Sequence, residues 1–235
     1  MKPWIRKTLW GLGIGTVLFV GVMGFAHTKW GRPLLGYFRG VPGCPAGFDA
    51  PVDPVKAEAF RQEHFRKMAG AEVARANPAL SFELGKTVRK EVEAWAQTAG
   101  ASCTEKRSGM VLGCGSLPEG AFPGPRIDDA HIQFDNQGTL VAVDVFRTVT
   151  AEAGVAHFLA TSKVIEAAVG KPTRTSGEAT PAHLAAGPMR MATADWEYKQ
   201  YEAKLSVMNY GNGRIRVREQ YEWVPATSEV TTASR

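Results

Sequence analysis

Cysteine is scarce in this chain, and the common short motifs of catalytic and metal sites are missing. Three cysteines among 235 residues are too few for a scaffold built from disulfides. No His-x-x-x-His or Cys-x-x-Cys pair occurs, so a transition-metal site would need ligands from distant segments. No Gly-x-Ser-x-Gly nucleophile motif occurs either. We therefore expect no metal, no cofactor and no catalytic residues, and a protein that is not an enzyme.

One short motif is similar to part of a nucleotide site. Gly85-Lys86-Thr87 matches the end of a phosphate-binding loop. That loop needs a glycine five positions earlier so that its backbone amides can surround a phosphate, and this position holds Leu80. Thr87 is better explained as a helix cap, and a nucleotide is not expected.

The body of the chain also lacks an excess of either charge. Six of the 28 Lys and Arg residues and one of the 23 Asp and Glu residues precede Asp53, so 22 of each sign lie from Asp53 onward. A nucleic-acid-binding domain carries its positive charge on the folded part. Nucleic acid is therefore not an expected partner. Charged residues at 22% and apolar residues at 44% are typical of a globular protein and exclude disorder throughout.

The N-terminal segment contains a long uncharged run. As a helix rising about 1.5 Å per residue, residues 8–26 would be about 28 Å long, close to the thickness of a bilayer core. Lys2, Arg6 and Lys7 precede this run and favour a cytoplasmic N-terminus. Residues 1–30 are thus predicted to be a signal anchor with a single-pass transmembrane helix in the inner membrane. The C-terminal domain would be extracytoplasmic.

The alternative for this segment is a cleaved signal peptide. Gly24 and Ala26 are small residues at the two positions that a signal peptidase reads, so cleavage after Ala26 would release a secreted or periplasmic protein. Both interpretations place the domain in the periplasm, where disulfides form.

Composition and helix signals divide the rest of the chain. Residues 31–52 are rich in Gly and Pro and are predicted to be a linker. Asp53 before Pro54 is typical of a helix start, so a helix is expected within 53–78, as a stalk or on the domain surface. Residues 79–224 are expected to form the extracytoplasmic domain, and 225–235 a polar tail.

Periodicity within 79–224 predicts an α+β fold in which helices pack on one face of an antiparallel meander sheet. Helical periods cover 87–100 and 150–169, and residues 174–188 are interpreted as a flexible connection. Alternating apolar residues predict two hairpins between the helices and three strands after the second helix.

The cysteines follow from the first hairpin. A turn at Ser108-Gly109 places Cys103 opposite Cys114, within disulfide distance. We predict that these two residues form a disulfide and that Cys44 stays unpaired within the chain. Cys44 is then either a free thiol or a bridge between two copies, which would make a homodimer.

An arginine stripe is the second candidate site. Arg214, Arg216 and Arg218 alternate with apolar residues, which places them on the wet face of one predicted strand. Such a stripe suits an anion, a lipid headgroup or a partner protein. The competing interpretation is ordinary pairing with Glu202 and Lys204 on the adjoining strand.

Residues 82–87 (Phe-Glu-Leu-Gly-Lys-Thr), followed by Glu91-Val92, resemble the opening of the outer-membrane assembly lipoproteins of the BamE/SmpA type. In that family, a Gly-x-Thr turn starts a helix that packs on an antiparallel meander. The β-lactamase inhibitor proteins have a similar helix-then-sheet unit in tandem. The sequences 134–140 and 170–172 fit the same general pattern. The resemblance implies a protein-binding envelope domain.

These observations lead to one functional expectation and two alternatives. The expectation is a membrane-anchored, non-enzymatic domain that binds another envelope protein. The first alternative is a domain that binds or senses an apolar, lipid-like small molecule. The second is a hydrolase whose site is assembled from residues distant in sequence.

Overall fold

The computed structural model describes residues 53–225 with the exception of Ser108 and Asn212. The predicted membrane segment 8–26, the linker 31–52 with Cys44, and most of the tail lie outside the described residues. Within the described ranges, no helix is both long enough and apolar enough to cross a bilayer.

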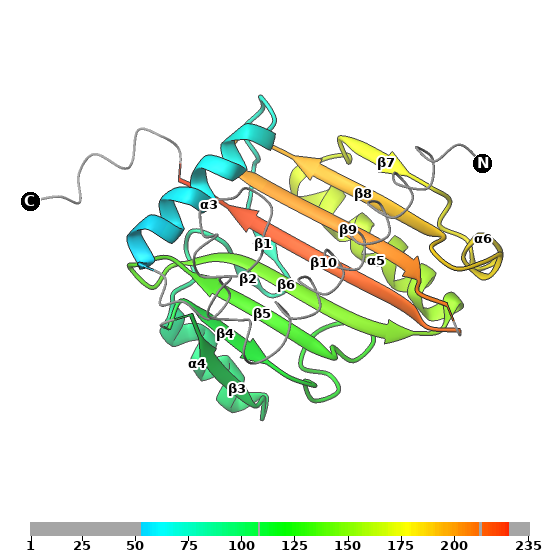
Figure 1. The fold of residues 1–235 in the computed structure, drawn as a ribbon, viewed down its shortest axis with the longest axis horizontal. Coiled ribbons are helices and arrows are strands. Elements are labelled where there is room, and N and C mark those ends of the chain that lie inside the picture. The colour runs from blue at the N-terminus through cyan, green and yellow to red at the C-terminus, as the bar shows by residue number, and fades with distance from the viewer. Residues whose placement is uncertain (1–52, 108, 212, 226–235) are drawn as a thin grey trace, which may run out of the picture. The chain divides into compact units, whose positions relative to one another are not determined.

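Helices and a large antiparallel sheet make up the described chain, and this confirms the predicted α+β class (Figure 1). The elements are α3 (Pro54–Met68), β1 (Pro78–Ala79), β2 (Phe82–Glu83), α4 (Arg89–Thr98), β3 (Cys103–Lys106), β4 (Val111–Cys114), β5 (Asp129–Phe134), β6 (Leu140–Val149), α5 (Ala151–Val169), β7 (Arg174–Ser176), α6 (Pro181–Ala185), β8 (Met191–Glu197), β9 (Tyr201–Asn209) and β10 (Ile215–Trp223). β1 and β2 form a small separate sheet.

The large sheet consists of two successive units, each made of one helix followed by four strands. Its eight strands lie in the order β3-β4-β5-β6-β10-β9-β8-β7, and all neighbours are antiparallel. α4 precedes the first four strands and α5 precedes the other four. The last strands of the two units, β6 and β10, pair at the centre. The connection predicted to be flexible at 174–188 contains β7 and α6.

α5 packs directly on the sheet and contributes Val155, Phe158, Ile165 and Val169 to the core. Its N-cap is Thr150, whose hydroxyl accepts a hydrogen bond from the Ala153 N–H, and it ends at Gly170. At Gly154, an added Cβ would lie 3.1–3.2 Å from side-chain methyl carbons of Val149, Val207 and Ile215. The helix therefore approaches the sheet as closely as a glycine allows.

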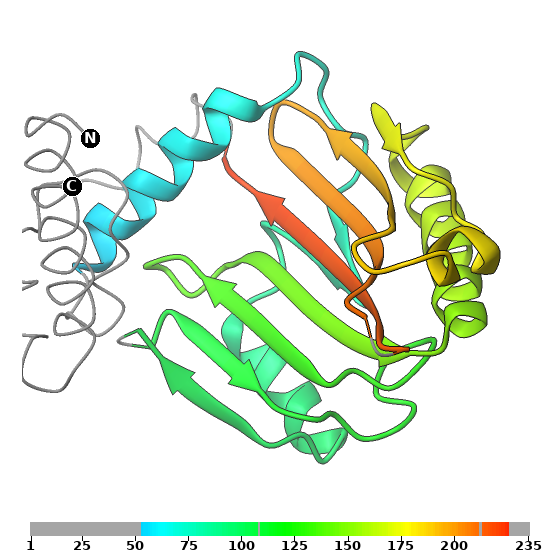
Figure 2. The same cartoon turned by 45° about the vertical axis from the view of Figure 1, so that its right-hand side comes forward.

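α3 lies on the other face of the sheet (Figure 2). Arg61 Nη1 donates to Glu222 Oε1 at 2.9 Å and to the Trp223 carbonyl at 2.8 Å. Phe65, one turn further along, is 1% exposed. α3 therefore packs on the domain surface. The single-face expectation concerned the helices within 79–224, and it holds for α4 and α5. α3 precedes that range, and its inward-facing residues include the polar Glu58 and Arg61, whose ion pairs a hydrophobic pattern does not register.

Candidate functional site

The sheet face opposite α5 is referred to as the open face. Its side chains alternate along each strand with those of the core, as in β9, where buried and half-buried residues alternate from end to end. On β6, β8, β9 and β10, it carries Ala142, Asp144, Phe146, Thr148, Arg216, Arg218, Gln220, Glu222, Glu202, Lys204, Ser206, Met208, Met191, Thr193, Asp195 and Glu197. Among the described helices, α3 contacts this face at its Glu222 end.

Most charges on the open face are paired with each other. Arg174 Nη2 lies 2.9 Å from Asp195 Oδ2 and 2.9 Å from Glu197 Oε1. Lys204 Nζ lies 3.4 Å from Glu202 Oε1. The Arg174 pairs cross from β7 to β8, the Lys204 pair lies within β9, and together they leave little net charge over most of the face.

The predicted arginine stripe is divided by the structure. Arg218 forms a bidentate pair with Asp144, at 2.9 Å from Nε to Oδ1 and 2.7 Å from Nη2 to Oδ2. This pair accounts for the raised pKa of Arg218, which burial opposes. The pairing partner is therefore on β6, and the predicted partners Glu202 and Lys204 pair with each other. Arg218 is neutralised and is not available to a ligand.

Arg214 and Arg216 have no carboxylate at salt-bridge distance among the described residues. Arg214 lies just before β10, and its carbonyl accepts the Tyr210 N–H at 2.9 Å, which continues the sheet by one pair. The Arg216 guanidinium carbon lies 5.2 Å from the Phe146 ring centroid and 5.7 Å from that of Tyr210. Two aromatic rings thus hold Arg216 without cancelling its charge.

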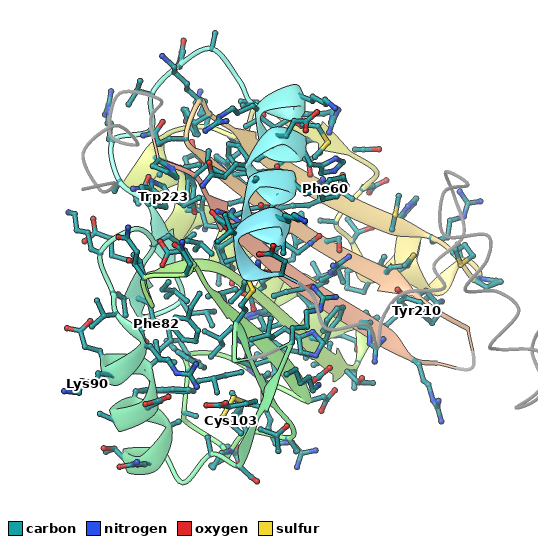
Figure 3. The ribbon with its side chains drawn as sticks, turned by 60° about the vertical axis from the view of Figure 1, so that its left-hand side comes forward. Phe60, Phe82, Lys90, Cys103, Tyr210 and Trp223 are labelled. Atoms are coloured by element: carbon teal, nitrogen blue, oxygen red, sulfur yellow. A yellow bond between two sulfur atoms is a disulfide. The ribbon has the colours of Figure 1, made fainter. Side chains whose placement is uncertain are left out.

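A hollow of about 430 Å³ lies beside these two arginines, lined by Thr148, Tyr210, Arg214 and Arg216. Figure 3 shows Tyr210 and Trp223 at opposite ends of the β9–β10 pair, so the hollow is remote from α3. The surrounding apolar side chains are unusually exposed: Met189 at 68%, Tyr210 at 53% and Met191 at 44%. We call this region the arginine–methionine corner, defined by Met189, Met191, Met208, Tyr210, Arg214 and Arg216.

Backbone geometry contributes to the corner. Met189 has a φ of 61°, in the left-handed region that a residue with a side chain rarely adopts. Its N–H donates to the Asn209 carbonyl at 2.7 Å, which fixes the segment beside the end of β9. The chain therefore holds an exposed apolar side chain in a strained conformation. Sequence reasoning did not single out Met189, Met191 or Met208.

A buried ionic cluster lies on the core side of the sheet. Glu219 Oε1 accepts hydrogen bonds from Arg147 Nε at 2.8 Å and lies 2.9 Å from His157 Nε2, while Tyr221 donates to Oε2 at 2.9 Å. Arg147 and Glu219 are each 1% exposed. Arg147 also donates to the Pro125 carbonyl.

The protonation of this cluster follows from its contacts. Burial acts to raise the pKa of Glu219, but the hydrogen bond from His157 and the charge of Arg147 outweigh burial and lower it. Burial and the adjacent Glu219 carboxylate raise the pKa of Tyr221. The cluster joins α5 to both central strands, and its burial closes it to a substrate. In the sequence, this cluster could have been recognised from Arg147 and Glu219, two charged residues at strand positions where alternation predicts a core residue.

The cysteine prediction is confirmed for the register and the pair. Cys103 lies opposite Cys114, and their Sγ atoms are 2.04 Å apart. Cys114 is fully buried, and its partner on β5 is Ala130. His131, one position on, pairs with Gly113 and therefore belongs to the open face, where it lies 3.4 Å from Asp129. Cys114 and His131 therefore do not form a pair of thiol nucleophile and imidazole base.

No three His, Cys, Asp or Glu side chains converge as metal ligands in the described ranges. Comparisons with protein families, curated proteins and solved structures found no match to this chain. The resemblance to the envelope modules stays a prediction.

Proposed function

We propose that this protein is a non-enzymatic, membrane-anchored extracytoplasmic domain that binds another envelope protein on the open face. The observation that carries the proposal is the arginine–methionine corner: exposed methionines, a tyrosine and two arginines with no carboxylate partner among the described residues, on a face whose other charges are mostly paired. Tyr, Met and Arg are the residues enriched at protein interfaces, whereas Lys and Glu are depleted there.

The two alternative functions have less support. An apolar ligand between helix and sheet would need space that α5 fills at Gly154. The residue set most similar to a catalytic site, Arg147, His157 and Glu219, is buried beneath α5 and its hydrogen bonds are satisfied within the protein. The α5–sheet interface therefore does not support an apolar ligand, and the buried cluster does not support a hydrolase.

Site-specific photocrosslinking of the full chain in its native membrane tests the proposal. A photoreactive amino acid replaces Ser206, which lies on the open face, or Lys163, which is exposed on α5. We expect a discrete adduct of higher mass from position 206 and none from position 163. Adducts from both positions, or from neither, would contradict a partner on the open face.

The proposed orientation has a separate test. The predicted membrane segment 8–26 and the basic residues before it support a location of the domain outside the cytoplasm. Protease added to intact spheroplasts should digest the domain. Protection in spheroplasts with digestion only after lysis would overturn the extracytoplasmic location.

A further inference from the structure

We infer that the arginine–methionine corner binds a peptide segment of the partner in which carboxylate side chains alternate with apolar ones. The inference rests on the proposed function and specifies the chemistry of the partner. It is carried by three features of the corner: its uncancelled charge, its fixed guanidinium and its apolar border.

The charge of the corner is local. Arg174, Lys204 and Arg218 on the open face are each paired with a carboxylate, whereas Arg214 and Arg216 line one hollow and have none within the part of the chain that the structure describes. The Asp128 carboxylate, which approaches Thr148 of this hollow, is already engaged: its Oδ2 accepts the Thr148 N–H at 2.6 Å and its Oδ1 lies 3.8 Å from Arg126 Nη2. A carboxylate from outside is therefore the complementary group, and an arginine fork binds it with two parallel hydrogen bonds.

The hollow is arranged before any ligand binds. Arg216 is held between the rings of Phe146 and Tyr210, so less side-chain entropy is lost when it forms a pair. Thr148 and Tyr210 line the same hollow, and their hydroxyls make no hydrogen bond to another described residue. They are two further polar groups at the hollow.

Met191 and Met208 form the apolar border of the corner, which would bind the apolar side chains of the peptide. Met191 and Met208 are directly paired across β8 and β9, and Met208 is paired with Arg216 on β10. Unbranched, polarizable methionines adapt to different apolar side chains. The combination of methionine with arginines fixed in a hollow favours a peptide over an anionic bilayer, because bilayer surfaces are bound by mobile Lys and Arg with Trp, Phe and Leu anchors.

Fluorescence anisotropy on the full chain in phosphatidylcholine nanodiscs tests the inference. The probe is a fluorescein-labelled Asp-Leu-Asp-Phe-Asp-Leu peptide, and its matched control replaces each Asp with Asn. We expect the acidic peptide to bind about tenfold more tightly than the Asn peptide, as one charge-assisted pair provides. In the variant carrying Arg214→Gln and Arg216→Gln, this preference should disappear. The control Arg75→Gln, an exposed arginine outside the sheet, should keep it.

A second variant separates the apolar contribution. The double variant Met191→Ser with Met208→Ser should bind both peptides more weakly by a similar factor, so the ratio of the two affinities should stay unchanged. Equal binding of the two peptides to the wild-type chain would overturn the inference. So would arginine-dependent binding to phosphatidylglycerol vesicles without a preference for the acidic peptide, because the ligand would then be a membrane surface.

Failure of the inference and failure of the proposed function are distinguishable. An adduct at position 206 without discrimination between peptides would contradict only the ligand chemistry. The absence of any adduct would contradict the proposed function itself. Unchanged denaturation midpoints in the arginine variants show that a loss of binding is not a loss of folding.

Discussion

The unit formed by α4 and β3–β6 and the unit formed by α5 and β7–β10 each have one helix followed by four strands, with α6 inserted between β7 and β8 of the second, and they meet through their last strands. Their helices differ in length: α4 has 10 residues and α5 has 19. The first unit has a covalent bond between its two outer strands, Cys103–Cys114. The second has a long packed helix, fixed to the central strands by the Arg147–Glu219–His157 cluster.

This difference indicates that one topology can be stabilised in two ways. A short helix buries little apolar surface, so its outer hairpin depends on a cross-link that restricts the unfolded chain. A long helix buries more, and within that interface a charged cluster is tolerated when each member has a partner. The following predictions test this comparison, starting with the largest expected effect.

Removing the carboxylate of the buried cluster should destabilise the protein most. Glu219→Ala leaves the Arg147 guanidinium buried without its partner, and we expect the free energy of unfolding to fall by about 3–5 kcal/mol. Urea denaturation measures this change. Glu93→Ala, which breaks the exposed pair with Arg89 on α4, should cost less than about 1 kcal/mol. Equal effects of the two substitutions would refute the distinction between the units.

Removing the disulfide should have the next largest effect. Cys103→Ala with Cys114→Ala opens a loop whose ends are 11 positions apart, and the chain-entropy argument gives about 3 kcal/mol. In hydrogen exchange, amides of β3 and β4 should lose protection before those of β9 and β10. Dithiothreitol should reproduce the effect in the wild type and leave the variant unchanged. If amides of both units lose protection equally, the disulfide does not act locally on the first unit.

Two glutamates of β10 should give pH dependences of opposite sign. The pKa of Glu219 is lowered on folding, so its contribution to stability is present above about pH 4.5 and is lost as the pH falls through the lowered value. Burial raises the pKa of Glu222, against the attraction of Arg61, so its contribution is largest below about pH 4.5 and is lost as the pH rises.

The corresponding variants isolate each glutamate. Glu219→Gln should flatten the loss of stability in acid, and Glu222→Gln should remove the penalty that develops as the pH rises. Denaturation midpoints measured from pH 3 to 8 check both expectations. If the Glu219→Gln variant loses stability in acid as steeply as the wild type, other carboxylates cause that loss.

The smallest expected effect concerns the strained methionine of the corner. Met189→Gly should raise the free energy of unfolding by about 0.5–1 kcal/mol, because glycine adopts a positive φ without strain and the side chain is 68% exposed. The matched control, Met191→Gly, replaces the same residue type inside β8 and should lower stability. If Met189→Gly destabilises the protein as well, Met189 makes a packing contribution that its exposure does not indicate.

Local sequence signals predicted much of the fold. Alternation located β9 and β10, and the turn at Ser108-Gly109 set the register that pairs Cys103 with Cys114. β7 and α6 were missed because three exposed strand residues and a five-residue helix are too short to show a period, although Thr180 before Pro181 was a cap signal.

The candidate site was only partly visible in the sequence, because it depends on which strands are neighbours. Alternation correctly placed Arg216 and Arg218 on one face, but Arg218 is cancelled by Asp144 on β6, a strand 74 positions away in sequence. The corner likewise combines β8, β9 and β10 with Phe146 of β6. Such contacts between strands cannot be predicted from the sequence before the strand order is known.

The position of β10 has a consequence for how the domain is made. β10 is the last strand of the described chain, yet it lies at the middle of the sheet between β6 and β9. While the chain is synthesised or exported N-terminus first, β6 and β9 both present unpaired edges until residues 215–223 arrive. The interval before that arrival is the period of greatest exposure to aggregation, and a truncation before Ile215 would make it permanent.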